Sequence, residues 1–74
     1  MQKTSVNIKK MDCPSEIKMI EGLMENLDPS AKMEFDLESR TVHFYHSVDK
    51  HQIIESLNTI SLPGELISTE EIGI

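Results

Sequence analysis

Two kinds of hydrophobic spacing alternate along this chain, and their order restricts the folds open to it. An apolar residue at every second position is typical of a half-buried strand, and this pattern covers residues 4–10, 32–38 and 41–47. Apolar residues three or four positions apart are typical of an amphipathic helix, and this spacing follows Cys13-Pro14 and returns over about 49–60. A less regular strand is expected over 65–70. The predicted order is strand, helix, strand, strand, helix, strand.

The same spacing predicts which side chains face the core. In the strands these are Val6, Ile8, Met33, Phe35, Leu37, Val42 and Phe44. In the helices they are Ile17, Ile20, Met24, Leu27, Ile53, Leu57 and Ile60. We expect Asp28-Pro29-Ser30 to end the first helix, Ser39-Arg40 to form a hairpin turn, and Ser47 or Asp49 to cap the second helix.

Two strand–helix–strand halves with right-handed crossovers form an antiparallel four-stranded sheet with both helices on one face. This is the α+β, ferredoxin-like βαββαβ architecture. The 74 residues are enough for one such domain, expected to span 1–74, and not for two. Because many unrelated functions use this fold, a function has to be argued from individual residues.

Charge and cysteine content restrict the partners. The formal net charge of −6 disfavours nucleic acid and anionic membrane surfaces, and favours a metal cation or a basic protein surface. Cys13 is the only cysteine, so no internal disulfide forms and a reducing compartment is expected. No apolar signal region or bilayer-length span is seen, so we expect a cytoplasmic protein without direct membrane insertion.

The segment between the first strand and the first helix reads Met11-Asp12-Cys13-Pro14-Ser15-Glu16. It resembles the signature of the heavy-metal-associated (HMA) domain family, which is Met, any residue, Cys, any two residues and a second Cys. In this chain Glu16 stands at the position of the second cysteine. Apolar residues at Ile17, Ile20, Met24 and Leu27 also match the family, and the resemblance covers roughly residues 4–72.

The resemblance implies a metal carrier, metallochaperone or metal-responsive module rather than an enzyme. Its partner would be a metal-transporting ATPase or another efflux protein. The acidic residue before the cysteine, Asp12, resembles the divalent-metal branch of the family more than the copper branch. An enzymatic role is also disfavoured by the residues themselves, because Cys13 has no evident base in the sequence.

The chemistry of the loop indicates the kind of ion. A cysteine at the start of a helix is favoured as the thiolate, which is the form that binds metal. Glu16 lies one helical turn further on and Asp12 directly precedes Cys13, so both carboxylates are candidate ligands. One sulfur with one or two oxygens suits zinc or another divalent transition-metal ion better than copper(I). A homodimer in which two chains share one ion through paired Cys13 thiolates would supply the missing second sulfur.

Structural alternatives remain open for these residues. Glu16 is equally interpretable as a helix-capping acid, capping is the slightly favoured interpretation of Asp12, and Met11 is expected to pack beneath the loop. His43 and His46 lie three apart on one strand and so point to opposite faces, and these two and His51 are expected to be surface histidines. The alternative function is a degenerate HMA-like protein-interaction module that binds no metal.

Overall fold

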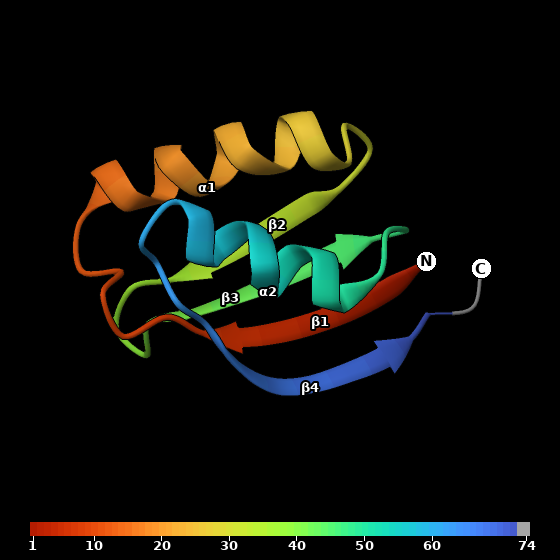
Figure 1. Cartoon of the computed structure of the whole chain (residues 1–74). Helices are drawn as coiled ribbons and strands as arrows, with labels where there is room; N and C mark the ends of the chain where they lie inside the picture. The colour runs from red at the N-terminus through yellow and green to blue at the C-terminus, as the bar shows by residue number, and fades with distance from the viewer. Residues whose placement is uncertain (73–74) are drawn as a thin grey trace.

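The chain forms a four-stranded sheet with two helices, seen here in a computed structural model (Figure 1). The structure describes residues 1–72, so the last two residues of the predicted domain lie outside the described residues. The elements in chain order are β1 (Gln2–Asn7), α1 (Pro14–Leu27), β2 (Lys32–Asp36), β3 (Thr41–His46), α2 (Lys50–Thr59) and β4 (Glu65–Glu71). The predicted order of six elements is confirmed.

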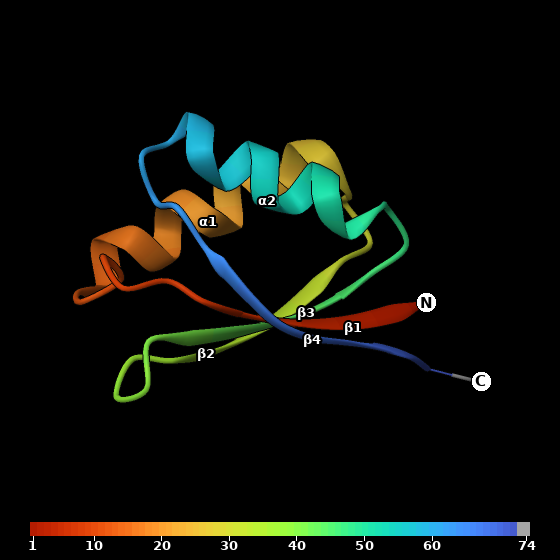
Figure 2. The same ribbon diagram turned by 60° about the horizontal axis from the view of Figure 1, so that its bottom comes forward.

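All strand pairs in the sheet are antiparallel, and the strand order is β2-β3-β1-β4. Figure 2 shows both helices on the same side of the sheet, as the ferredoxin-like prediction requires. Strand β1 lies at the centre of this sheet, paired with β3 on one side and with β4 on the other. Within residues 1–72, no helix covers the opposite face of the sheet (Figure 2).

The core lies between the helices and the inner face of the sheet. Its fully or almost fully buried apolar residues are Val6, Ile8, Met11, Ile20, Met24, Val42, Phe44, Ile53, Leu57 and Leu62. Most of these are the positions that the hydrophobic spacing predicts. Complete burial of one such large side chain stabilises the folded state by roughly 1.5–3 kcal/mol. Neither helix within residues 1–72 combines the length and the apolar character needed to cross a bilayer.

Two predicted strands end two or more residues too late, each because a turn begins earlier than the alternation indicates. Strand β1 ends at Asn7 and not at residue 10, because a turn is closed by the Met11 N–H donating to the Ile8 carbonyl at 3.0 Å. Strand β2 ends at Asp36 and not at residue 38, and Leu37 is exposed rather than inward-facing. The hairpin turn covers residues 37–40, because the Arg40 N–H donates back to the Leu37 carbonyl.

Asp28 joins the end of α1 to the segment that precedes α2. It is 7% exposed, and its Oδ2 accepts the Ser47 N–H at 2.9 Å. Its Oδ1 accepts the Ser30 hydroxyl at 2.8 Å and the Ser30 N–H at 3.2 Å. These bonds, first that from Ser47, hold the pKa of the Asp28 carboxyl below its usual value. The predicted cap of α2 is also confirmed, since Asp49 accepts the His51 N–H at 2.7 Å.

Candidate metal site

The loop that carries the candidate ligands is held by a buried residue at its start and by the beginning of α1 at its end. Met11 is completely buried, which anchors the chain to the core directly before the exposed Asp12. Cys13 has extended backbone angles (φ −149°, ψ 163°) and is the N-cap of α1, with Pro14 in the first turn. Proline suits this place because a residue there needs no N–H for the helix. Cys13 therefore lies at the start of the helix, as predicted, where unpaired N–H groups and the helix dipole favour negative charge.

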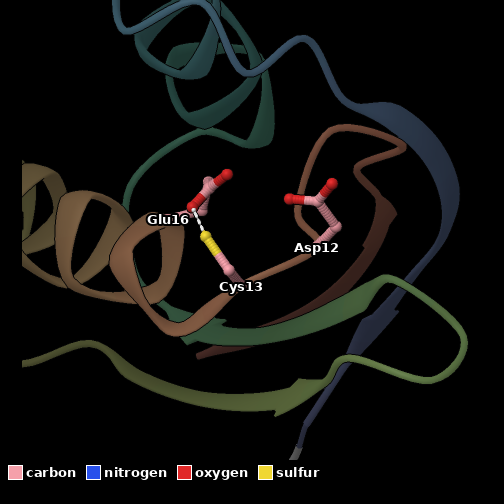
Figure 3. Close-up of side chains that lie close together, drawn as sticks. All are labelled: Asp12, Cys13 and Glu16. Carbon is pink, nitrogen blue, oxygen red and sulfur yellow. Dashed lines mark hydrogen bonds between the residues drawn. The ribbon is translucent and has the colours of Figure 1, made fainter.

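Three potential ligands converge at this position. One ligand atom from each of Asp12, Cys13 and Glu16 lies within 4.8 Å of the others (Figure 3). The thiol of Cys13 donates a hydrogen bond to Oε2 of Glu16 at 2.7 Å. Cys13 and Glu16 are half-buried, whereas Asp12 is exposed. The structure thus brings together all three residues named from the sequence.

Ser15 is a fourth member of the cluster that the sequence analysis did not single out. Its Oγ donates to Oε2 of Glu16 at 2.6 Å and lies 2.9 Å from the Cys13 sulfur. Serine is common at helix starts for purely structural reasons, so its type alone carries no signal. Only its position in the sequence could have indicated a role, because Ser15 lies between the candidate ligands Cys13 and Glu16.

The Glu16 carboxylate is the acceptor at the centre of this cluster. Hydrogen bonds from the Cys13 thiol, first, and from the Ser15 hydroxyl, second, lower the pKa of the Glu16 carboxyl from its usual value. The ionised carboxylate is the form that accepts both bonds and the form that coordinates a cation. The same arrangement that stabilises the charge therefore also keeps a ligand ready.

The spacing of the donor atoms fits a tetrahedral ion after small side-chain rotations. With Zn–S near 2.3 Å and Zn–O near 2.0 Å, a sulfur and an oxygen ligand of zinc lie about 3.5 Å apart. The Cys13 sulfur and Glu16 Oε2 are 2.7 Å apart while a proton bridges them. An ion in place of that proton would increase this distance by less than about 1 Å. The 4.8 Å limit of the whole cluster would have to close by about 1.3 Å to reach the same spacing. One sulfur and two carboxylates form a donor set that transition-metal ions accept.

The capping alternatives can be compared with these contacts. Within residues 1–72, the Glu16 carboxylate accepts from the thiol and hydroxyl side chains, and the N-cap Cys13 makes no side-chain capping bond. Asp12 lies outside the helix, before its cap. Its carboxylate and that of Glu16 extend to the same side of the loop in Figure 3. The geometry leaves both carboxylates available to a bound cation.

The three histidines lie outside this cluster, and one contradicts expectation. His51 is exposed and pairs with Asp49 at 3.0 Å, and His43 is half-buried on the outer sheet face, where Nδ1 contacts Ser5 Oγ at 2.7 Å. His46 is wrongly predicted as a surface residue: it is completely buried. The reason is the strand alternation itself, since Val42, Phe44 and His46 share the inner face. His46 Nε2 lies 2.6 Å from Thr4 Oγ1, and Nδ1 lies 2.7 Å from the Val48 carbonyl.

The cluster lies at the surface rather than inside a pocket. A groove of about 310 Å³ exists beside the same loop, but none of the three candidate ligands lines it. Its lining residues are Asn7, Lys9, Lys10, Pro63, Gly64 and Glu65. A bare ion needs ligand atoms and no large cavity, so a surface cluster can hold one. A surface site also leaves room for a ligand from a second protein.

Comparisons with known proteins give a structural answer and no sequence-based one. No protein-family model matches the chain, and no curated protein matches its sequence. A gold-binding protein superposes with a TM-score of 0.82 at 22% identity, over 86% of this chain and 98% of that one. A trimeric form of the copper chaperone Atx1 from Synechocystis PCC6803, carrying a His61Tyr mutation, superposes with a TM-score of 0.78 at 16% identity, over 82% and 97% of the two chains.

A third structure, described as concerning crosstalk between Cu(I) and Zn(II) homeostasis, gives a TM-score of 0.74 at 21% identity. It covers 85% of this chain and 97% of the other. At these identities the superpositions establish the fold. The chain therefore has the ferredoxin-like fold found in a gold-binding protein and in Atx1-type copper chaperones.

Proposed function

We propose that this chain is an HMA-type carrier domain that binds a divalent transition-metal ion and passes it to a metal-transporting ATPase or another efflux protein. The observation that carries the proposal is the convergence of Asp12, Cys13 and Glu16 at the start of α1. Its fold supports the proposal, because structures named as a gold-binding protein and a copper chaperone share it. In this role the chain is a carrier and not an enzyme.

The donor set supports zinc or a related divalent ion over copper(I). Copper(I) prefers two soft sulfur ligands, and a single chain offers one sulfur, on Cys13. Zinc accepts sulfur and carboxylate oxygen together in a four-coordinate site. Three ligands from this chain leave one position for water or for a residue of the receiving protein, which suits transfer. The net charge of −6 suits a receiving surface that is basic.

Titration of the reduced protein with cobalt and zinc tests this proposal. Cobalt should give a sulfur-to-metal charge-transfer absorption band, and zinc should displace the cobalt. Cys13→Ser should abolish the band, while Glu16→Gln should weaken binding. Glu21→Gln is the matched control, because it makes the same change in charge at an exposed position of the same helix. Affinity should also rise with pH, since the thiol loses its proton on binding.

The opposite metal preference would refute the proposal. Failure to bind cobalt or zinc, together with tight binding of copper(I), would assign the chain to the copper-handling class. Sedimentation with and without zinc distinguishes a single-chain site from a homodimer that shares one ion. A metal-dependent dimer that disappears in Cys13→Ser would show that two thiolates are used.

One observation favours a second candidate function, a protein-interaction module without metal. The thiol of Cys13 already has a hydrogen-bond partner in Glu16, so the cluster is satisfied in the absence of an ion. In such a module, Cys13→Ser would preserve binding to the partner protein. In a carrier the same substitution would abolish metal transfer to it.

A further inference from the structure

We infer that Ser15 is a positioning residue of this metal site, whose hydroxyl holds one carboxylate oxygen of Glu16 so that the other oxygen is presented to the ion. This inference rests on the proposed metal-binding function. It assigns a role to a residue that lies between the candidate ligands and is not itself one of them.

Two donors share Oε2 of Glu16. The Cys13 thiol donates to it at 2.7 Å and the Ser15 hydroxyl at 2.6 Å. Each of these groups has one proton. The Ser15 hydroxyl also lies 2.9 Å from the Cys13 sulfur, a contact in which either group can be the donor.

Metal binding removes only one of these two donors. Cys13 would bind as the thiolate and its proton would pass to solvent, so its hydrogen bond to Glu16 would be lost. The Ser15 hydroxyl keeps its proton and can continue to donate to Oε2. The second oxygen of Glu16 is then free for the ion. In Figure 3 this second oxygen points away from the sulfur, on the side of the loop where the Asp12 carboxylate lies.

Without this bond, the carboxylate would be held less well. A glutamate has three rotatable side-chain bonds, and half-buried Glu16 projects from the first turn of α1. Hydrogen bonds from outside the coordination shell orient metal ligands, and their loss typically reduces metal affinity by roughly 10–100-fold. Because Ser15 is exposed, the lower part of that range is expected, a loss of about tenfold in affinity.

The test compares cobalt affinity and absorption for the native chain, Ser15→Ala and Ser15→Thr. Ser15→Ala should bind cobalt about tenfold more weakly, with altered ligand-field bands at longer wavelength and a retained sulfur charge-transfer band. Ser15→Thr keeps a hydroxyl and should bind like the native chain. Ser68→Ala, on the exposed part of β4, is the matched control and should have no effect.

A double-mutant cycle separates positioning from a general effect on the helix. In the Glu16→Gln background, Ser15→Ala should cause little further loss of cobalt affinity, because the oxygen that Ser15 positions has already lost its charge. An equal loss in both backgrounds would overturn the inference, as would native affinity and spectrum in Ser15→Ala. Either result leaves the proposed function intact. Absence of cobalt binding by the native chain, or unchanged binding by Cys13→Ser, would instead refute the proposed function itself and the inference with it.

Discussion

Replacing Asp28 with asparagine tests whether one buried carboxylate connects the two helical halves of the domain. Asparagine keeps a carbonyl oxygen that can accept from Ser30, but it presents an amide N–H₂ group where Oδ2 accepts the Ser47 N–H. Two donors would then face each other at a position only 7% exposed. A lost hydrogen bond to a charged group costs about 1.5–3 kcal/mol, so we expect a loss of about 2 kcal/mol.

A loss of this size is a large part of the free energy of unfolding of the domain. A chain of this length has a free energy of unfolding of about 4–11 kcal/mol. For a domain of this size, about 2 kcal/mol corresponds to a fall of roughly 8–16 °C in the thermal midpoint. The measurement is thermal unfolding at pH 7 followed by circular dichroism, with urea unfolding as a second estimate. Asp36→Asn is the control: its carboxylate also accepts a backbone N–H, but in an exposed turn, and its midpoint should remain near the native value.

The effect of Asp28→Asn should depend on pH in a defined direction. The pKa of Asp28 is lowered in the folded state, so its carboxylate contributes fully above the ordinary value of about 3.9. This contribution is lost as the pH falls through the lower, folded-state pKa. The difference between native and variant midpoints should therefore shrink in acid below about pH 4. An unchanged midpoint at pH 7, or an equal difference at pH 7 and pH 2, would refute this reasoning.

The remaining predictions concern the core and two glycines. Gly64→Ala should destabilise the fold by about 1–3 kcal/mol in urea unfolding, because a Cβ at Gly64 would clash with the Val6 side chain; native stability in this variant would contradict the packing described. Gly22→Ala is its counterpart and should stabilise by roughly 0.5–1 kcal/mol, since Gly22 lies in helix α1 with open space where the added Cβ would be; a loss of stability would argue against an exposed helical position. His46→Ala should cost at least about 2 kcal/mol, because it opens a cavity beneath β3 and removes the nearer of two partners of the Thr4 hydroxyl; His51→Ala, at an exposed position, should change the unfolding midpoint little.

Local spacing in the sequence was sufficient for the order of the elements and for the candidate cluster. Strand and helix periods depend on backbone geometry over a few residues. The burial of Val6, Ile20 and Phe44 follows from these periods. Cys13 and Glu16 are also local neighbours, three residues apart at a helix start, so their proximity follows from the helix itself. The strand ends were less predictable, because turns at residues 8–11 and 37–40 are closed by backbone bonds that the apolar pattern does not encode.

Contacts between distant segments were decided only by the tertiary structure. The pairing of His46 with Thr4 joins residues 42 positions apart, and that of Asp28 with Ser47 joins residues 19 apart. Such contacts depend on the register between β1 and β3 and on where α1 stops relative to the next strand. The orientation of the Ser15 hydroxyl toward Glu16 is a local contact, but several rotamers satisfy the same sequence. The sequence alone therefore determined the order of the elements and the proximity of Cys13 and Glu16 at the start of α1. The folded chain decided which atoms form hydrogen bonds, because these bonds form only at specific distances and angles.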